Sequence, residues 1–458
     1  MTESINNSPT LIVLGGGESG VGAALLGKAK GFNVFLSDKG LLSDSYKQIL
    51  IDNAIAFEEG QHTETRILEA SLVVKSPGIP DKVPLIQQLI ALKTPIISEI
   101  EFAARYTKAK FVAITGSNGK TTTTLLTYHL LREAGVNVGL AGNIGQSLAK
   151  QVIKDDFEWY VLELSSFQLD NMYDFKANVA ILLNITPDHL DRYNYDFQQY
   201  VNAKFRILQN LEPSDTFIYW QESEAIAQNL NKFPSLAKHL PISLNQQQNQ
   251  GGSFINGQLH ANYNTASFEI SQSNLPLKGV HNAINSLCAI LVAQTLGLSS
   301  EQILGGLLSF QNVEHRLEQV LENKGIKYVN DSKATNVDSV FYALGSFTEP
   351  IVLIMGGVDK GNDYAQIEAL VKEKVKALVC VGTDNQKLFD FFGDKIAVIK
   401  DTHSMAEAVA EAQKLANVGD VVLLSPACAS FDLFKNYEDR GQQFKMLVNE
   451  LANKPNKN

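Results

Sequence analysis

Residues 115–121, Thr-Gly-Ser-Asn-Gly-Lys-Thr, combine the groups that bind a triphosphate, between the apolar run 111–114 and a helical leucine pattern. In such a strand–loop–helix unit, backbone N–H groups and the positive end of the helix dipole face an anion. Lys120 adds a positive charge, and the Thr121 hydroxyl is suited to Mg²⁺. Ile114 replaces the first glycine of the strict G-x-x-x-x-G-K-[ST] pattern, so an ordinary glycine-rich turn remains an alternative. The loop predicts a protein that uses ATP.

Further polar side chains follow two other apolar runs. Glu163 lies near the end of the run that begins at Trp159, and Asp188 and His189 follow the run 179–185. Because ligands sit beyond the carboxyl ends of strands in open parallel sheets, these side chains are expected at the same edge as Lys120. A carboxylate and an imidazole near a triphosphate are plausible Mg²⁺ ligands, directly or through water.

Each of these residues also has a simpler interpretation. Glu163 is equally compatible with an ion-pairing residue at a strand end, and His189 with a solvated loop histidine. Lys204 lies within the helical pattern 197–211, where a lysine ordinarily faces solvent.

A second glycine loop stands near the N-terminus, after the apolar run Leu11–Leu14. Gly15, Gly17 and Gly20 spell G-x-G-x-x-G, and Asp38 ends the next apolar run. This satisfies the dinucleotide-binding fingerprint, but the same geometry serves any nucleotide diphosphate. The loop therefore predicts a nucleotide site without specifying NAD.

Composition bounds the class of protein. With 458 residues, 45% of them hydrophobic and 19% charged, the chain is expected to form roughly three globular domains of ~150 residues. The net charge of −10 argues against nucleic-acid binding. The three cysteines lie far apart and suggest neither disulfides nor a zinc site, and no apolar run is long enough for a signal peptide or a membrane span. A reduced cytoplasm and no membrane contact are expected.

The order of the patterns predicts an α/β protein with three domains. Residues 1–98 are expected to form a Rossmann-like domain, and 99–311 a central P-loop ATPase-type parallel sheet. Within the latter, 212–277 predicts a small peripheral β-sheet. Residues 312–458 repeat strand and helix and predict a second Rossmann-like domain. Three polar segments of this last part are expected to form a pocket at one sheet edge, namely 330–336, 356–361 and 425–430.

Taken in order, the motifs resemble those of the Mur ligase family of bacterial peptidoglycan synthesis. They are Thr115–Thr121, Gly142–Gly145, Glu163–Leu169, Asp188–Arg192, His281-Asn282, His315-Arg316 and Asn330–Asn336. The terminal segments 424–432 and 437–441 are most similar to those of the D-glutamate-adding members. The resemblance spans nearly the whole chain.

The resemblance implies an ATP-dependent amide ligase that adds D-glutamate to UDP-N-acetylmuramoyl-L-alanine. In this family ATP converts the substrate carboxylate to an acyl phosphate, which the incoming amino group then attacks. The implied cofactors are ATP and Mg²⁺ at two sites. The implied partners are these small molecules alone, and a monomer is expected.

The resemblance also implies roles for individual residues. The catalytic residues would be Lys120, His189 and Lys204, the last carbamylated in the family. Metal ligands would be Thr121, Glu163, His189 and Lys204. ATP would be bound by Gly116, Ser117, Asn118, Gly119, Lys120, Thr121, Thr122, Asn282, Asn285, Arg316 and Asp331. The sugar nucleotide would contact Ser19, Asp38, Ser76, Gly78 and Asn143, and D-glutamate would contact Thr335, Lys360, Ser430 and Phe431.

Other functions remain open at this stage. A nicotinamide-dependent oxidoreductase would use Gly15–Gly20 and Asp38 but would leave Lys120 and Glu163 without a role. A non-catalytic nucleotide sensor would bind nucleotide without turnover. Within the family, a diaminopimelate-adding ligase would carry a D-N-P-R motif, which is absent here. Folylpolyglutamate synthetase shares the phosphate loop but does not account for the terminal segments.

Glu18 places an acidic residue beside the expected uridine diphosphate, and the orientation of its side chain is left open.

Overall fold

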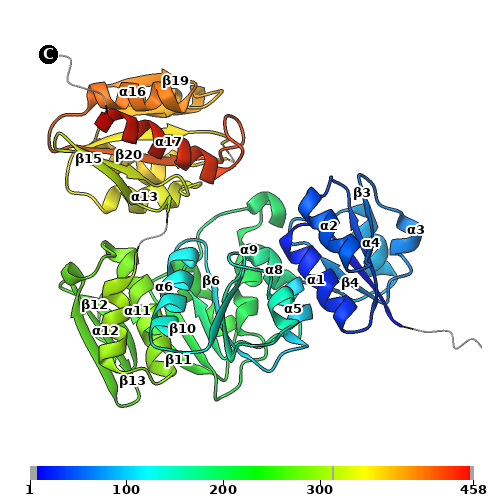
Figure 1. Cartoon of the computed structure of the whole chain (residues 1–458). Coiled ribbons are helices and arrows are strands. Elements are labelled where there is room, and N and C mark those ends of the chain that lie inside the picture. The colour runs from blue at the N-terminus through cyan, green and yellow to red at the C-terminus, as the bar shows by residue number, and fades with distance from the viewer. Residues whose placement is uncertain (1–7, 312–313, 360, 454–458) are drawn as a thin grey trace, which may run out of the picture. The chain divides into compact units, whose positions relative to one another are not determined.

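The computed structural model describes residues 8–311, 314–359 and 361–453. The chain divides into two compact units. The first comprises Met1–Asn274 and Ile284–Ser309, and the second comprises Leu275–Ala283 and Phe310–Asn458. Two sheets lie in the first unit and one in the second (Figure 1). The α/β class with three parallel-sheet cores is therefore confirmed, whereas the domain boundaries at 98/99 and 311/312 remain predictions.

The N-terminal sheet has five strands in the order β3-β2-β1-β4-β5, all parallel. Its strands are β1 (Thr10–Leu14), β2 (Asn33–Asp38), β3 (Ala56–Glu59), β4 (Leu72–Lys75) and β5 (Ile96–Ile97). Its helices are α1 (Glu18–Ala29), α2 (Asp44–Asp52), α3 (Glu64–Ile67) and α4 (Pro84–Ala91). The strand order reverses between β1 and β4, and ligands bind at such a switch point. The Gly15–Gly20 loop and Ser76 follow these two strands.

The central sheet has nine strands in the order β14-β13-β12-β11-β10-β9-β6-β8-β7. Its strands are β6 (Lys110–Thr115), β7 (Val138–Gly142), β8 (Trp159–Glu163), β9 (Val179–Leu182), β10 (Thr216–Trp220), β11 (Lys238–Ser243), β12 (Gly251–Ile255), β13 (Gln258–Tyr263) and β14 (Ala266–Ser271). Pairing is parallel from β7 to β12 and antiparallel from β12 to β14. The peripheral strands expected within 212–277 are present, and they extend the central sheet.

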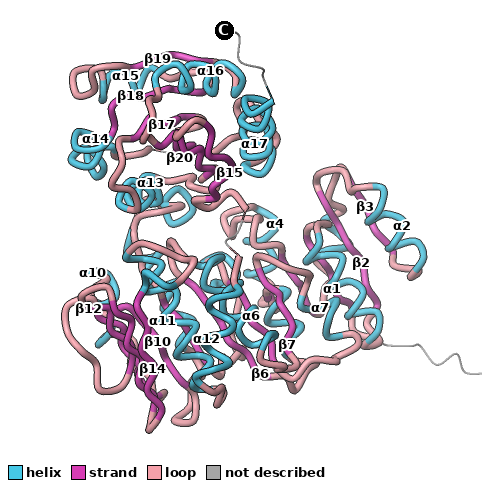
Figure 2. Tube along the Cα trace, turned by 60° about the vertical axis from the view of Figure 1, so that its left-hand side comes forward, coloured by secondary structure: helices cyan, strands magenta, loops and turns pink. Residues whose placement is uncertain are grey.

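Helices cover the central sheet and carry several of the candidate residues (Figure 2). They are α5 (Glu99–Ala104), α6 (Lys120–Glu133), α7 (Leu148–Val152), α8 (Ser166–Asp170), α9 (Phe197–Phe205), α10 (Glu224–Asn229), α11 (Val280–Thr295) and α12 (Ser300–Ser309), with short 3₁₀ helices η1 (Leu190–Tyr193), η2 (Arg206–Leu208), η3 (Leu230–Lys232) and η4 (Gln272–Asn274). The middle strand β6 is buried after its first residue because helices pack on both faces, which explains its apolar run.

The sheet of the second unit has the order β15-β16-β20-β17-β18-β19, parallel except for β15–β16. Its strands are β15 (Glu318–Asn323), β16 (Ile326–Asn330), β17 (Ile351–Gly356), β18 (Val375–Val381), β19 (Ile399–Thr402) and β20 (Val421–Ala427). Its helices are α13 (Val337–Gly345), α14 (Glu368–Lys374), α15 (Gln386–Phe392), α16 (Met405–Leu415) and α17 (Tyr437–Asn453), with η5 (Tyr364–Ile367).

Side chains of this sheet alternate between two cores. Along β17, Leu353 and Met355 pack on one face, and Val352 and Ile354 pack on the other. Because both faces are covered, the strand is apolar throughout. Its carboxyl edge is left for the polar segments that follow the strands.

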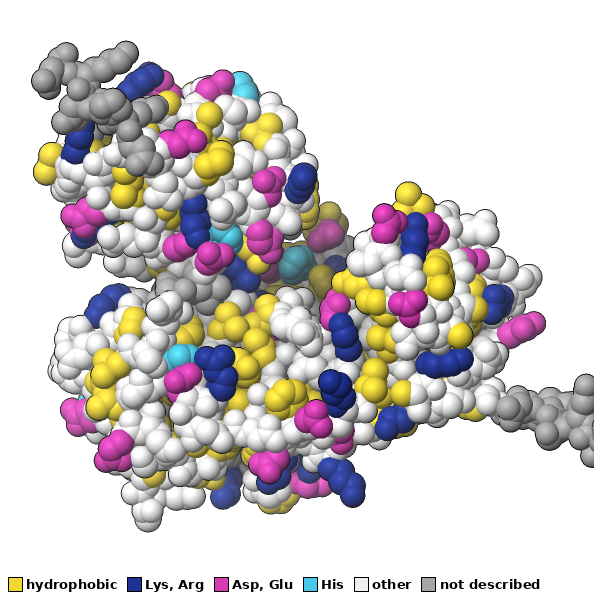
Figure 3. All heavy atoms as spheres, viewed as in Figure 1, with side chains coloured by type: hydrophobic (Ala, Val, Ile, Leu, Met, Phe, Trp, Pro, Cys, Tyr) yellow, Lys and Arg dark blue, Asp and Glu magenta, His cyan; other side chains and the backbone are white. Residues whose placement is uncertain are grey.

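The surface carries charges of both signs. On the face shown in Figure 3, Lys and Arg side chains are interspersed with Asp and Glu side chains. Within the described part of the chain, no helix has both the length and the apolar character required to cross a membrane.

Candidate active site

The loop between β6 and α6 has backbone conformations that favour glycine. Gly116 has φ 153° and Gly119 has φ 84°, both in the region that L side chains rarely adopt. A Cβ on Gly119 would lie 2.6 Å from Asn285 Oδ1, and one on Gly116 would lie 3.0 Å from Leu183 Cβ. Both glycines are therefore required by close packing as well as by dihedral angle.

The segment after β9 holds this loop in shape. The Ser117 amide donates to the Asn184 carbonyl (2.8 Å), and the Ser117 hydroxyl donates to the Thr186 carbonyl (2.8 Å). The Asn118 amide donates to Asn184 Oδ1 (2.8 Å), while Asn184 Nδ2 donates back to the Asn118 carbonyl (3.1 Å). The loop is thus preorganised, so that binding an anion does not require it to be ordered first.

Lys120 is the first residue of α6, and its ammonium lies inside the loop. Its Nζ donates to the carbonyls of Gly116 (2.8 Å) and Ser117 (2.7 Å). Thr121 and Thr122, in the same first turn, are 3% and 5% exposed. The positive charge and the helix N-terminus therefore act at one place, as anion binding requires.

Glu163 stands beside this loop because β8 pairs with β6 in a register that opposes Ile114 and Glu163. The side chain is 2% exposed, and Oε1 accepts a hydrogen bond from Asn143 Nδ2 (2.8 Å). Oε2 is buried and has no hydrogen-bond partner among the described residues. Burying a carboxylate oxygen without a hydrogen-bond partner costs free energy unless a cation pairs with it. The donor set therefore fits a hard cation such as Mg²⁺.

Lys204 lies in α9 and its side chain is 1% exposed. The interpretation of Lys204 as a solvent-facing lysine, which its helical pattern suggested, is therefore wrong. Its Nζ donates to the Gly116 carbonyl (2.7 Å) and to Thr115 Oγ1 (3.1 Å). Burial, reinforced by the nearby charge of Lys120, holds the pKa of Lys204 well below its usual value. A lower pKa increases the fraction of neutral amine, which is the form that reacts with carbon dioxide to give a carbamate.

His189 precedes η1 in a left-handed conformation (φ 52°), and its side chain is 44% exposed. Its Nε2 lies 3.7 Å from Asp188 Oδ2, and its ring meets the edge of Phe167 at 5.2 Å between centroids. The carboxylate of Asp188 is close enough to oppose the lowering of the Lys204 pKa. Asp188 and His189 are thus near the loop, although the described residues contain no group of three or more His, Cys, Asp or Glu side chains suited to a metal. Any metal here would need the Thr121 hydroxyl, a lysine carbamate or phosphate oxygens as further ligands.

The two candidate asparagines of α11 fall in different units. Asn285, in the first unit, is 4% exposed, and its Oδ1 accepts from Thr123 Oγ1 (3.1 Å) in the first turns of α6. Asn282, in the second unit, donates from Nδ2 to the Lys278 carbonyl (2.8 Å). The structure therefore brings Asn285 to the phosphate loop.

In the N-terminal domain, Asp38 closes the first glycine loop. Its Oδ2 accepts from the Gly16 amide (2.6 Å) and its Oδ1 from the Gly40 amide (2.7 Å). A Cβ on Gly15 would lie 2.6 Å from Ser76 Cβ, so the loops after β1 and β4 are in contact. The Gly78 amide lies 3.4 Å from Ser76 Oγ. Asp38, Ser76 and Gly78 thus gather at the switch point of the sheet.

Glu18, whose orientation was open, is held by other elements. Its Oε2 accepts from the Tyr46 hydroxyl (3.1 Å) in α2, and its Oε1 accepts from the Ser147 amide (3.3 Å) before α7. Ser19, the neighbouring candidate, is half-buried. The carboxylate of Glu18 is therefore engaged in packing α1 against α2 and α7.

In the second unit, Asp331 follows β16 and is 5% exposed. Its Oδ2 accepts from Ser425 Oγ (2.8 Å), and its Oδ1 accepts from the Leu317 amide (3.3 Å). Burial raises the pKa of Asp331 to about 7, against the opposing charge of Arg316. The candidates Arg316 and Asp331 are therefore close together, at the carboxyl edge of the sheet.

Of the remaining candidates of this unit, Thr335 follows β16, and Ser430 and Phe431 follow β20, its neighbour in the sheet. Ser430 is 2% exposed, Phe431 is 73% exposed and Thr335 is half-buried. Lys360 lies outside the described residues.

Arg440 connects the segments that follow β16 and β20. No role was assigned to this residue from the sequence. This fully buried guanidinium donates from Nε to Ser332 Oγ (3.0 Å), from Nη2 to the Ser332 carbonyl (2.8 Å) and from Nη1 to the Cys428 carbonyl (3.1 Å). The only sequence signal for a role of Arg440 was its position within the terminal motif 437–441. Its partners are distant in sequence, so only the fold reveals them.

Comparison with known families agrees with this geometry over three ranges of the chain. Residues 11–83 match the MurD N-terminal domain, 114–293 match the Mur ligase middle domain, and 315–428 match the Mur ligase glutamate ligase domain. The chain therefore belongs to the Mur ligase family, whose members are ATP-dependent. All three matches are to ligase domains, which favours this function over a nicotinamide-dependent oxidoreductase.

Curated relatives narrow the comparison to one branch. A protein of Cytophaga hutchinsonii named UDP-N-acetylmuramoylalanine–D-glutamate ligase is 54% identical over 449 residues, which is 97% of this chain and 100% of that protein. A Porphyromonas gingivalis protein of the same name is 53% identical over 443 residues, or 96% of this chain and 98% of that protein. The resemblance drawn from the motifs, to the MurD branch of the family, is thus confirmed.

Solved structures share the fold at low identity. A pseudomurein peptide ligase type C from Methanothermus fervidus superposes with a TM-score of 0.63 at 18% identity, covering 97% of this chain and 100% of that one. The MurF ligase of Thermotoga maritima in complex with ADP gives 0.60 at 16% identity, covering 92% and 96%. The three-domain α/β architecture is therefore that of the Mur ligases.

Proposed function

We propose that this chain joins D-glutamate to UDP-N-acetylmuramoyl-L-alanine, using ATP, in the synthesis of peptidoglycan precursors. Relatives that carry this activity in their names align with nearly the full chain at 53–54% identity. The observation that carries the chemistry is the phosphate loop, where Lys120 and the buried Lys204 both donate to the Gly116 carbonyl. The carboxylate of Glu163 is close enough to oppose the lowering of the Lys204 pKa.

The first step activates the carboxylate of the sugar nucleotide. One of its oxygens attacks the γ-phosphorus of ATP, the bond to the β-phosphate oxygen breaks, and ADP leaves with that electron pair. In this step Lys120 stabilises the charge on the transferring phosphoryl group. Bound Mg²⁺ would neutralise further charge on the phosphates, with Thr121 and Glu163 as ligands at one site and His189 and carbamylated Lys204 at a second.

The second step forms the amide. The neutral amino group of D-glutamate attacks the acyl carbon, the resulting tetrahedral intermediate loses inorganic phosphate, and the amine gives up a proton. A carboxylate resists amine attack because its oxygen is a poor leaving group. Phosphorylation removes this obstacle, so turnover requires all three substrates.

The substrate contacts are proposed as the resemblance implied them. The sugar nucleotide contacts Ser19, Asp38, Ser76, Gly78 and Asn143, the nucleotide contacts residues 116–122 with Asn282, Asn285, Arg316 and Asp331, and D-glutamate contacts Thr335, Lys360, Ser430 and Phe431. The carboxylates of D-glutamate need a cationic partner, which accounts for Lys360. We further propose that the protein acts as a monomer in the cytoplasm, where ATP is available, and that it comprises domains 1–98, 99–311 and 312–458.

Phosphate release from ATP tests this function. With UDP-N-acetylmuramoyl-L-alanine present, we expect release with D-glutamate and little with L-glutamate, D-alanine or diaminopimelate. Omitting either the sugar nucleotide or D-glutamate should abolish it. Release that is indifferent to D-glutamate, or a stronger response to another amino acid, would refute the assignment.

A further inference from the structure

Arg192, in η1 of the central domain, reaches a turn of the N-terminal domain. Its Nη1 donates to the Gly78 carbonyl (3.0 Å), and its Nη2 donates to the carbonyls of Pro77 (2.7 Å) and Ile79 (3.0 Å). These are three consecutive residues after β4. One guanidinium therefore holds a complete turn that is more than 110 positions away in the sequence.

The other face of this guanidinium rests on an aromatic ring. The Arg192 Cζ atom lies 4.6 Å from the centroid of Phe167, which is in α8. The same ring lies edge-on to His189 (5.2 Å) and stacks on Tyr193 (6.0 Å). Arg192 thus contacts both the turn and the aromatic ring that meets His189.

A second cation supports the turn from the N-terminal side. Lys75, the last residue of β4, is 2% exposed and donates from Nζ to the Ile79 carbonyl (2.7 Å). Its ammonium also pairs with Asp81 Oδ1 (3.0 Å). The Ile79 carbonyl therefore accepts from two cationic side chains, and the conformation of the turn depends on both.

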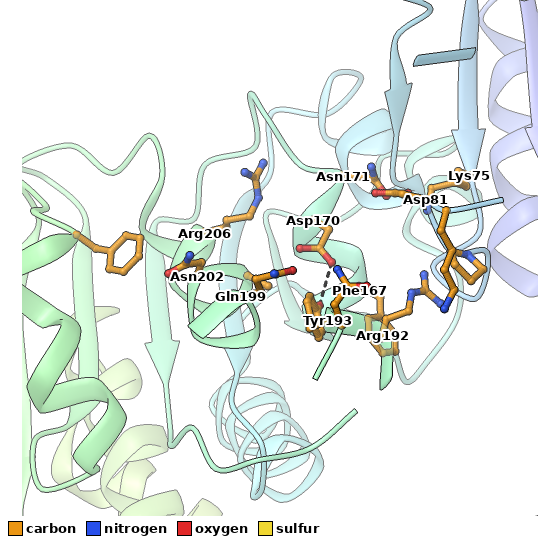
Figure 4. A pocket seen from close by; sticks show the side chains of 15 residues that line it. Lys75, Asp81, Phe167, Asp170, Asn171, Arg192, Tyr193, Gln199, Asn202 and Arg206 are labelled. Atoms are coloured by element: carbon orange, nitrogen blue, oxygen red, sulfur yellow. Dashed lines mark hydrogen bonds and ion pairs between the residues drawn. The ribbon is translucent and has the colours of Figure 1, made fainter. Parts of the chain in front are cut away.

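The surroundings of Arg192 are open. A cavity of about 600 Å³ adjoins it, lined by residues that include Lys75, Asp170 and Arg206 (Figure 4). At this point the guanidinium of Arg192 joins the two domains. Removing the guanidinium would leave Lys75 on the Ile79 carbonyl but would remove the contacts of the Pro77 and Gly78 carbonyls to the central domain, and the adjoining space would let the turn relax.

We infer that Arg192 is a positioning residue that fixes the turn 76–79 against the central domain, and thereby sets where the sugar nucleotide lies relative to His189 and the phosphate loop. The inference rests on the proposed function, in which Ser76 and Gly78 contact that substrate. Gly78 links the contact to Arg192 with the proposed substrate contact. Its carbonyl accepts from Arg192, while its amide lies 3.4 Å from Ser76 Oγ.

Two variants test this role in the full-length protein. Arg192→Lys keeps the charge but replaces the planar fork by a single ammonium, which cannot serve three carbonyls and stack on Phe167 together. Arg192→Ala removes both interactions. Arg132→Ala is the matched control, since this arginine of α6 has a side chain that is 57% exposed and contacts Glu133 and Tyr128 of its own helix.

The expected result is a selective loss of affinity for one substrate. In Arg192→Lys, KM for UDP-N-acetylmuramoyl-L-alanine should rise roughly tenfold, and calorimetric Kd should rise in parallel. KM for ATP and for D-glutamate should change less than about twofold, as should all constants of Arg132→Ala. Arg192→Ala should show the same selectivity, with a larger increase in KM and Kd for the sugar nucleotide. If Arg192→Ala does not fold, Arg192→Lys alone decides the test.

Two outcomes would overturn the inference. An unchanged KM and Kd for the sugar nucleotide in Arg192→Lys would show that the turn does not depend on the guanidinium. Equal losses for all three substrates, with a lowered Tm, would show a purely structural role. Wild-type protein that binds the sugar nucleotide but releases no phosphate with D-glutamate would instead refute the proposed function, and the calorimetric comparison would still decide the role of Arg192.

Discussion

Replacing Glu163 by glutamine should lower activity and stabilise the ligand-free protein at the same time. The side chain is 2% exposed, and its Oε2 has no hydrogen-bond partner in the described part of the structure. An unsatisfied buried acceptor costs about 1–3 kcal/mol, and more when it is charged. Glutamine retains an oxygen for Asn143 Nδ2 and removes the charge.

The magnitudes follow from these two facts. The Nε2 amide of glutamine takes the unpartnered position but carries no charge. We therefore expect the free energy of unfolding to rise by about 1 kcal/mol, which corresponds to a Tm increase of a few degrees. Turnover should fall by roughly 10²–10³-fold, since a charge that stabilises the transferring phosphoryl group through a bound cation is lost. Stability and activity therefore move in opposite directions, which general damage to the fold would not produce.

Thermal unfolding and phosphate release measure the two effects. Without ligands, Glu163→Gln should melt above the wild type, whereas addition of Mg²⁺ and ATP should raise Tm less than in the wild type. Glu158→Gln is the matched control, because Glu158 is an exposed glutamate just before β8. A Glu163→Gln variant that melts below the wild type and keeps at least half of its activity would refute this reasoning.

Three further variants test other parts of the site. Lys120→Ala should reduce turnover by at least ~10³-fold with little change in Tm, because it removes a charge directed at the phosphates; near-normal phosphate release would contradict the assignment. Lys204→Ala should be inactive and partly restored by acetate, whose carboxylate replaces the proposed carbamate, and a failure of acetate and other short carboxylates to restore activity would count against carbamylation. Burial raises the pKa of Asp331 from 3.8 to about 7, so the folded protein binds more protons than the unfolded chain between these values. Wild-type stability should therefore decline relative to Asp331→Asn as pH rises from about 4 to about 7 in thermal unfolding, and parallel pH profiles would show that the raised pKa is absent.

The phosphate loop could be predicted from sequence because its determinants are local. An apolar run, two glycines and a lysine at the start of a helix lie within about a dozen consecutive residues, and they dictate strand, loop and helix N-terminus. The strand expected over Val179–Ile185 was less accurate, since β9 ends at Leu182. Asn184 leaves the sheet to hydrogen-bond Ser117 and Asn118, a requirement that periodicity does not express.

A similar shift occurs in the second unit. Residues 396–399 (Ile-Ala-Val-Ile) form an apolar run of the kind that predicts a strand, whereas β19 covers Ile399–Thr402. The Ile396 amide donates to the Phe392 carbonyl at the end of α15, so the first residues of the run complete the helix and not the strand. Here a local hydrogen bond outweighs hydrophobicity.

The amino-acid order by itself determined the types of element and which residues stand at strand ends, because backbone geometry and hydrophobic periodicity act over short distances. Only the tertiary structure decided the environment of individual side chains. It buried Lys204 against Gly116, left an oxygen of Glu163 without a partner, and placed Arg192 on a turn of another domain. Charge, desolvation and hydrogen bonding depend on neighbours that the fold brings from far along the chain, and these neighbours are set by packing, which no local pattern records.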